Sequence, residues 1–282
     1  RQLHMASLAE KQAERAQVHL AGKQPIWLMR LRQVCSVAYR GSREKKVTLM
    51  TGTRPSSLPD YHFYGRRKGR ALSAHMKQLL STELPRLSVD KAALTSAPLA
   101  SQFDSHKDVL FLEIGFGGGE HLAQLAAGNP QAGFIGAEPF INGVASLVRQ
   151  IDEHELSNIR IWSDDVRPLL EVIEPGCLDG VYVMFPDPWP KRRHAYRRIM
   201  SQKMLDSLAR LVAPGGFLRM ASDHPIAKTW LLAEAMRHPA FDWRAETAAD
   251  WRRRPESWPE TRYMAKGTKE GRASSWFDFA RR

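Results

Sequence analysis

The sequence predicts an α/β fold with a doubly wound, mostly parallel sheet that helices cover on both faces. Short apolar runs alternate with helical patterns between residues 108 and 237, and Gly, Pro or Asp residues bound these runs. Such alternation indicates βαβ units, whose strands are buried on both sides. The 282 residues are 43% hydrophobic, which is enough for a sizeable core and excludes disorder throughout.

The first half of the predicted sheet follows from three apolar runs. The run over 109–114 predicts a strand, and four glycines lead from it into a helix over 120–127. Two further strands are expected over 133–137 and 158–162, with a helix over 141–155 between them. Each strand is therefore followed by a turn at the same edge of the sheet.

The second half repeats this pattern. A strand over 178–185 ends at a proline-rich loop, and a helix is expected across 197–211. A strand over 216–221 and a helix over 225–237 follow. The aromatic segment from Phe241 onwards is expected to add one or two edge strands.

Charge divides the chain into three parts. Residues 1–49 carry a net charge of +7, so that only +5 of the formal +12 belongs to the remaining residues. We expect residues 1–57 to be a poorly ordered extension and linker, with a natural start at Met50, although an organelle-targeting peptide is an alternative. Residues 58–107 are expected to form a basic arm and a helix over 73–84, and residues 108–282 the main domain.

Composition also limits the location and the partners. Cys35 and Cys177 lie too far apart in sequence for a disulfide framework or a zinc site, which suits a reducing compartment. No apolar run approaches the roughly 18 residues that span a bilayer. We therefore expect a cytoplasmic protein without a metal, whose basic excess favours nucleic acid or an acidic membrane surface as partner. Monomer and homodimer remain equally open.

The first strand-to-helix turn is rich in glycine. Glu113 stands near the strand end, Gly115 and Gly117 follow, and Glu120 begins the helix. Glycines let the backbone approach a ligand closely, but a dinucleotide fingerprint would have a glycine where Glu120 stands. A cationic or zwitterionic ligand fits this turn better than a phosphate, and the alternative is a tight junction without a ligand.

Acids at the next two strand ends favour a nucleoside. Glu138 follows the second strand at the spacing typical of an acid that binds ribose hydroxyls. Asp165 follows the third strand in a polar turn that suits an adenine amino group. A glycine-rich turn with these two acids and no phosphate site predicts S-adenosylmethionine as the ligand.

The fourth strand leads into an unusual loop, Phe185 to His194, that contains three prolines in five residues. The prolines fix a rigid loop, which presents Asp187 and Trp189 at the mouth of the sheet. Lys191 and several arginines follow directly. Cations beside an acid and an aromatic residue suit nucleic acid, whereas a solvated helix start would explain the arginines alone.

These motifs carry a resemblance to a known family. The string Phe-Pro-Asp-Pro-Trp-Pro-Lys-Arg-Arg-His over 185–194 resembles the bacterial tRNA (guanine-N7)-methyltransferases. So do Glu-Ile-Gly-Phe-Gly at 113–117, Gly-Ala-Glu at 136–138, Ser-Asp-His at 222–224 and Thr-Arg-Tyr at 261–263. The similarity runs from about residue 63 to the end of the chain.

The resemblance implies a Rossmann-like class I methyltransferase that methylates N7 of guanine at position 46, in the variable loop of tRNA. It implies that S-adenosylmethionine is bound by Glu113, Gly115, Gly117, Glu138, Asp165 and Asp187. It implies that Asp187 is also the catalytic residue. It assigns guanosine contacts to Lys191, Asp223, Thr261, Arg262, Tyr263 and Met264.

The chemistry agrees with these residues, because guanine N7 has a free lone pair and loses no proton on methylation. The enzyme has to align the reacting atoms and exclude water. A carboxylate such as Asp187 or Asp223 suits the positive charge that develops on the base. Asp187 is therefore expected to orient and stabilise, and not to abstract a proton.

One departure from the family concerns Met264, because the family usually has Glu at this position. The lost carboxylate leaves two alternatives open: Asp223 carries more of the recognition, or activity or base choice has shifted. A catalytically silent RNA-binding relative is the main competing hypothesis. Methylation of an adenine or cytosine amino group would predict Asn/Asp-Pro-Pro-aromatic in place of Pro-Asp-Pro-Trp.

A second basic cluster precedes the main domain. The resemblance implies that Arg66, Arg67, Lys68 and Arg70 form a flexible arm that closes over the RNA, and a solvated charge run is the alternative. His121 and His224 lie near strand ends, where supporting or surface positions are expected for them. The C-terminal aromatic residues are expected to pack in the core more often than to stack on bases.

Overall fold

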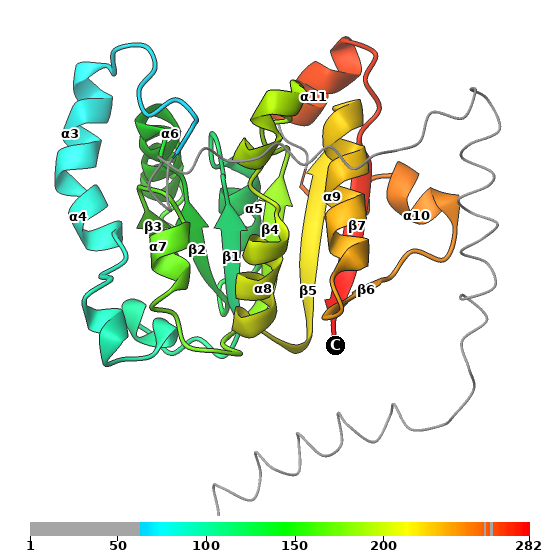
Figure 1. The fold of residues 1–282 in the computed structure, drawn as a ribbon. Coiled ribbons are helices and arrows are strands. Elements are labelled where there is room, and N and C mark those ends of the chain that lie inside the picture. Colours follow the sequence, from blue (N-terminus) through cyan, green and yellow to red (C-terminus); the bar gives the residue numbers. More distant parts are fainter. Residues whose placement is uncertain (1–62, 257, 260–261) are drawn as a thin grey trace, which may run out of the picture. The chain divides into compact units, whose positions relative to one another are not determined.

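The computed structural model describes residues 63–256, 258–259 and 262–282, within which seven strands form one sheet (Figure 1). The expectations for residues 1–57 and Thr261 lie outside the described residues, as do those for the side chains of Arg262 and Tyr263. The strands are β1 (Leu110–Ile114), β2 (Gly133–Ala137), β3 (Ile159–Trp162), β4 (Leu178–Met184), β5 (Val212–Ser222), β6 (Phe241–Trp243) and β7 (Ser275–Arg281).

The strand order is β3-β2-β1-β4-β5-β7-β6. Strands β1 to β5 pair in parallel with their neighbours, whereas β7 runs antiparallel to both β5 and β6. The sheet is doubly wound, Rossmann-like and mostly parallel, which confirms the predicted fold class. The order reverses between β1 and β4, and ligands bind at the carboxyl ends of the strands beside such a reversal.

Helices cover both faces of the sheet (Figure 1). The helices α3 to α6 share one apolar cluster with one face of the sheet, and α7 to α9 share another with the opposite face. The helices are α3 (Ala74–Thr82), α4 (Leu84–Leu87), α5 (Glu120–Gly128), α6 (Ile141–Glu153), α7 (Arg167–Leu170), α8 (Gln202–Leu211), α9 (Pro225–Arg237), α10 (Ala248–Arg252) and α11 (Arg262–Lys269). Three short 3-10 helices are η1 (Ala93–Thr95), η2 (Leu99–Gln102) and η3 (Arg192–Arg197).

Alternation along each strand produces these two clusters. On β2, Phe134 packs in the cluster of α5 and α6, while its neighbour Ile135 packs in the cluster of α7 to α9. Successive side chains of a strand point to opposite faces. A strand that is apolar at every position is therefore buried on both sides, as the sequence predicted.

Two expected helices begin or end elsewhere. The helix expected across 197–211 begins only at Gln202, because Ser201 is its N-cap and its hydroxyl accepts a hydrogen bond from the Met204 amide at 3.3 Å. Residues 192–197 form η3 instead. The helix expected over 73–84 ends at Thr82, and Pro85 lies in the first turn of the separate helix α4.

The C-terminal segment adds two strands, but only β6 lies at the edge, because β7 inserts between β5 and β6. Trp258, Trp276 and Phe277 are buried, which confirms core packing for these three aromatic residues. Trp251 is half-buried on α10. No helix among the described residues combines the length and the apolar character needed to cross a membrane.

Candidate active site

The glycine-rich turn joins β1 to α5 in a conformation that requires glycine. Gly115, Gly117 and Gly119 have φ angles of 74°, 56° and 82°, values that residues with a Cβ adopt at a cost. A Cβ at Gly119 would also lie 2.7 Å from Leu147 on α6. The turn therefore brings its backbone to the carboxyl edge of the sheet and packs closely against α6.

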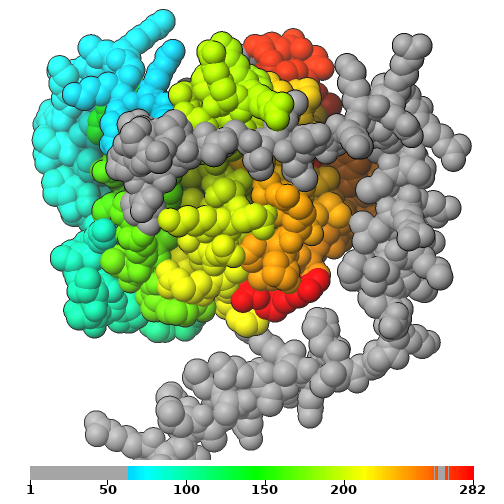
Figure 2. Space-filling model, in the orientation of Figure 1, coloured from blue at the N-terminus to red at the C-terminus, as the bar shows by residue number. Residues whose placement is uncertain are grey.

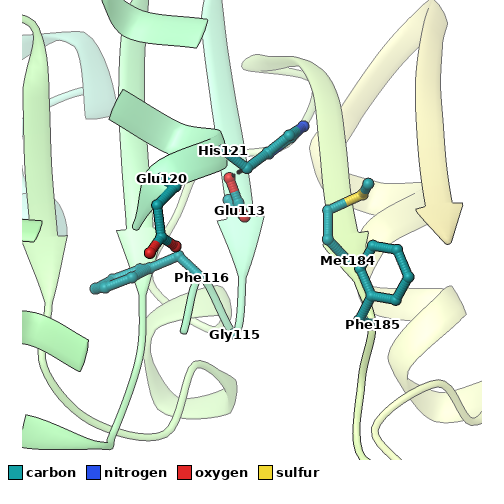
Figure 3. A pocket seen from close by; sticks show the side chains of 7 residues that line it. All are labelled: Glu113, Gly115, Phe116, Glu120, His121, Met184 and Phe185. Atoms are coloured by element: carbon teal, nitrogen blue, oxygen red, sulfur yellow. Dashed lines mark hydrogen bonds and ion pairs between the residues drawn. The ribbon is translucent and has the colours of Figure 1, made fainter. Parts of the chain in front are cut away.

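A pocket opens beside this turn, between the ends of β1 and β4 (Figure 3). Its lining consists of Glu113, Gly115, Phe116, Glu120, His121, Met184 and Phe185. Two of the predicted cofactor residues, Glu113 and Gly115, thus lie together in one pocket. Glu113 is fully buried and its Oε2 lies 2.8 Å from His121 Nδ1.

Glu138, at the end of β2, is tied to the same turn. Its Oε2 accepts a hydrogen bond from the Gly117 amide at 2.8 Å, and its Oε1 accepts one from the Phe140 amide at 2.9 Å. Burial raises the pKa of Glu138 although these amides oppose the rise, and the negative charges of Asp187 and Glu113 raise it further. Glu138 is therefore close enough to Asp187 and Glu113 to be affected by both.

Asp187 lies in a strained loop after β4. Phe185 and Trp189, which flank the Pro-Asp-Pro segment, have φ angles of 52° and 38°, values that are unfavourable for bulky residues. Such strain persists where surrounding contacts impose it, and it concentrates at functional sites. Asp187 as a whole residue is exposed, but partial burial of its carboxyl raises the pKa of this group.

Asp165, after β3, is held by its own neighbour. Arg167 donates from Nε to Asp165 Oδ1 at 2.9 Å and from its backbone amide at 3.0 Å. Burial acts to raise the pKa of Asp165, but the bonds from Arg167 outweigh it, so the pKa lies below the usual value. Asp165 is therefore a fixed carboxylate, and the adjacent Asp164 forms an ion pair with Arg67 at 2.8 Å.

The basic segment after β4 encloses an arginine in aromatic rings. The guanidinium of Arg197 lies 4.7 Å from the ring centre of Tyr64, 5.0 Å from Trp189 and 5.5 Å from Tyr196. Contacts of this kind are cation–π interactions. They attach the start of the described chain to the loop of Asp187, while the predicted Lys191 is exposed just before η3.

The backbone of the basic arm, which the resemblance implies to be flexible, is hydrogen-bonded to the start of α6. The Arg67 carbonyl accepts from the Ile141 amide at 3.0 Å. The Asn142 side chain accepts from the Gly69 amide and donates to the Arg70 carbonyl, both at 2.7 Å. In the space-filling view, the blue-cyan start of the described chain adjoins the yellow-green segment after β4 (Figure 2).

The side chains of Arg66, Arg67, Lys68 and Arg70 nevertheless remain exposed. The backbone is therefore fixed while the charges face solvent. Asn142, which fixes the arm, lies more than 70 residues further along the chain, and no local sequence signal reveals it.

Of the predicted guanosine residues, Asp223 directly follows β5 and Met264 lies on α11. Asp223 accepts from Arg272 Nε at 2.7 Å, and a Cβ at Gly267 would lie 2.6 Å from Asp223 Oδ2. Met264 is buried in an apolar cluster with Met184 and Trp276. The methionine at this position thus contributes to packing, whereas Asp223 is half-buried and paired with Arg272.

The structure also places the two histidines near the strand ends and one aromatic residue of the arm. His121 was expected at a supporting or surface position, and it is buried in the pocket wall beside Glu113, which is a supporting position. His224 caps α9, where its Nδ1 accepts from the Ile226 amide at 3.2 Å. Tyr64 gave no signal beyond its place beside the basic cluster.

Comparison with known proteins decides the family. The family model described as "Putative methyltransferase" matches residues 107–275. The chain is 48% identical over 226 residues to the tRNA (guanine-N(7)-)-methyltransferase of Rhodospirillum rubrum, covering 79% of this chain and 89% of that relative. The chain belongs to the tRNA (guanine-N7)-methyltransferase family.

A second member of this family, from Brucella anthropi, is 43% identical over 221 residues and covers 78% of this chain and 95% of its own length. Among solved structures, an antibiotic-related methyltransferase matches with 16% identity and a TM-score of 0.44, covering 68% of this chain and 94% of that chain. A precorrin-6y C5,15-methyltransferase from Geobacter metallireducens matches with 11% identity and a TM-score of 0.42, covering 68% and 88%. The family assignment therefore comes from the sequence relatives.

Proposed function

We propose that this protein transfers a methyl group from S-adenosylmethionine to N7 of guanine in tRNA, at position 46 of the variable loop. The observation that carries the proposal is the gathering of Glu113, Glu138 and Asp187 at the switch point of the sheet, in a chain of this family. Three carboxylates at one edge favour a ligand with positive charge. The catalytic domain would then span residues 108–282, and a tRNA substrate favours the cytoplasm.

The residues present fit S-adenosylmethionine. A Cβ at Gly115 would meet nothing within 4 Å, so the backbone there is open to an approaching ligand. Glu138 is fixed by two amides, and each of its oxygens has a second lone pair for a ribose hydroxyl. Glu113 would face the methionine part and Asp165 the adenine, and Gly115 and Gly117 would lie against the ligand. The bound cofactor supplies an electrophilic methyl group.

The protein's own contribution is orientation and electrostatics. Guanine N7 needs no general base, so Asp187 does not have to take up a proton. Its carboxylate, held by the strained loop between Phe185 and Trp189, would stabilise the positive charge on the methylated base. Preorganised charges of this kind act without reorganisation during the reaction.

Recognition of the target guanosine is assigned to Lys191, Asp223 and the segment over 261–264. Asp223 would accept from guanine N1–H and the amino group of the base, although Arg272 also binds its carboxylate. Arg272 is itself shared with Glu270, so it could exchange partners when a base binds. Met264 is buried in the apolar cluster, which supports Asp223 as the main acidic contact.

The direct test uses unmodified tRNA transcripts and S-adenosylmethionine labelled in the methyl group. We expect label in N7-methylguanosine, mapped by nuclease digestion to position 46, and no label when that guanosine is replaced by adenosine. Label in an adenine or cytosine product would refute the proposal. Binding of the cofactor without methyl transfer would favour the alternative, a catalytically silent RNA-binding protein. This alternative is considered because Met264 stands where the family usually has Glu.

The arm offers a test of tRNA binding. Replacing Arg66, Arg67 and Lys68 with Gln should weaken tRNA binding, because exposed cations release counterions from phosphates. The slope of log affinity against log salt should fall by roughly 0.7 to 0.9 for each phosphate that the arm no longer neutralises. Filter binding at several salt concentrations measures both quantities.

A matched control replaces Lys77, Arg149 and Lys203, which lie on α3, α6 and α8, with Gln. This variant loses the same formal charge but should keep the salt slope of the unmodified protein. Equal slopes for the two variants would show that only net charge matters and that the arm has no specific role.

Acid pH should reduce methyl transfer earlier than ordinary carboxyl groups would. Burial raises the pKa of Glu138, and desolvation raises the pKa of Asp187. Both groups act as carboxylates here, so activity is lost as the pH falls through these raised values, above the ordinary range near pH 4. The measurement is kcat/KM from about pH 8 down to about pH 4. A rate that stays constant over that range would contradict the expectation.

A further inference from the structure

Glu113, the acid at the end of β1, is paired with a buried histidine. His121 Nδ1 lies 2.8 Å from Glu113 Oε2, and the two side chains are 2% and 1% exposed. In Figure 3, His121 stands beside Glu113 in the wall of the pocket, with a ring nitrogen turned away from the carboxylate. Among the described residues, His121 is the side chain that lies within hydrogen-bond distance of Glu113. A buried carboxylate without a compensating donor is strongly destabilised, so this contact has a large effect on Glu113.

Glu113 also begins a row of polar side chains that crosses four adjacent strands. Strand pairing aligns Glu113 with Tyr182 on β4, Tyr182 with Arg219 on β5, and Arg219 with Asp278 on β7. Aligned residues of neighbouring strands share a face of the sheet. The arginine of this row is therefore a second candidate for compensating Glu113.

The contacts within the row exclude that candidate. Arg219 Nε lies 3.5 Å from Asp278 Oδ2, which is an ion pair without a hydrogen bond. The guanidinium lies 4.0 Å from the ring centre of Phe217, so its contacts are with these residues and not with Glu113. Between Arg219 and Glu113 stands Tyr182, and burial raises the pKa of this phenol, which keeps it neutral. His121 packs edge-on against Tyr182, with ring centres 5.2 Å apart, which fixes the plane of the imidazole.

We propose that His121 is a positioning residue for cofactor binding, which holds Glu113 as an oriented carboxylate. The Nδ1–H of the imidazole would donate to Glu113 Oε2, leaving the other oxygen for the ammonium group of the methionine part of the cofactor. The proposal deepens the proposed function and rests on it, because it requires that the pocket binds S-adenosylmethionine.

The second imidazole nitrogen supports this assignment. His121 Nε2 is buried and has no hydrogen-bond partner among the described residues. An unpaired buried polar atom lowers stability, and native proteins contain few of them. A histidine kept only for packing would be replaced by an apolar residue without that penalty, so the Nδ1 contact with Glu113 is the contact that accounts for a histidine here.

The test compares two variants of similar size by calorimetric titration with S-adenosylmethionine. His121→Leu removes the donor and should weaken binding by roughly ten- to hundredfold, the effect of losing a hydrogen bond to a charged group. His121→Asn keeps an N–H donor near the position of Nδ1 and should bind within about threefold of the unmodified protein. Equal loss in both variants would refute the positioning role.

A second ligand and a double variant separate positioning from general damage. 5′-Methylthioadenosine lacks the amino-acid part, so His121→Leu should change its affinity by less than about twofold. Glu113→Gln should weaken S-adenosylmethionine binding, and adding His121→Leu to it should have little further effect, because the two residues act as one unit. Additive losses would overturn the proposal.

A matched control is His238, another buried histidine, whose Nε2 lies 3.0 Å from Asp206 Oδ1 outside the pocket. His238→Leu should lower the melting temperature while cofactor affinity stays unchanged. If the unmodified protein fails to bind S-adenosylmethionine, the proposed function fails, and this inference fails with it. If the unmodified protein binds and His121→Leu binds equally well, only the inference fails.

Discussion

Replacing Asp187 with Asn is expected to reduce methyl transfer by about 10²- to 10³-fold, with tRNA affinity changed by less than about twofold. Asn keeps the size of the side chain but removes the charge that would stabilise the positively charged product base. The loop geometry should survive, because the backbone strain lies at Phe185 and Trp189 and not at Asp187 itself. Single-turnover kinetics with saturating tRNA and cofactor measure the chemical step, and filter binding measures affinity.

Asp152→Asn serves as the control, because Asp152 is an exposed aspartate near the end of α6. It should change neither turnover nor tRNA affinity. If Asp187→Asn lowers turnover and tRNA affinity by the same factor, Asp187 binds the substrate and does not stabilise the transition state. The pH dependence of methyl transfer by Asp187→Asn is a second test. In this variant Glu138 is the one that remains of the two acids with raised pKa values.

Most of the site residues that the sequence could predict lie at the ends of strands. In a parallel sheet, residues at successive strand ends meet at one edge, so the sequence alone places Glu113 and Glu138 together. The glycine turn could also be placed, because three of its residues need positive φ angles. These predictions depend on local pattern and on one topological rule.

The remaining features depend on contacts between distant segments. The row from Glu113 to Asp278 exists because β7 inserts antiparallel beside β5, and this pairing aligns Asp278 with Arg219. The arm is docked because the Asn142 side chain meets the backbone of Gly69 and Arg70. Neither contact produces a periodic or compositional pattern in the sequence. The start of α8 at Gln202, by contrast, could have been predicted from Ser201, which is a typical N-cap residue.

Gly143→Ala should lower the free energy of unfolding by about 2–4 kcal/mol and weaken cofactor binding by at least roughly tenfold. Gly143 lies in the first turn of α6, where a Cβ would come 2.1 Å from the Gly117 carbonyl oxygen. A backbone atom cannot rotate away as a side chain can, so α6 and the glycine turn have to separate. That separation would disturb the hydrogen bond from the Gly117 amide to Glu138. Urea denaturation measures the stability, and calorimetric titration measures the affinity.

The same substitution at Gly128 should not lower the free energy of unfolding. Gly128 is the last residue of α5, and a Cβ there would meet nothing within 4 Å. Alanine is the better helix former by about 1 kcal/mol, so Gly128→Ala should leave stability unchanged or raise it slightly, with unaltered cofactor affinity. Because helix propensity favours alanine at both positions, a loss confined to Gly143 measures the contact between α6 and the glycine turn. Loss of stability without loss of cofactor affinity would show that the turn binds no ligand, and it would count against the proposed cofactor site.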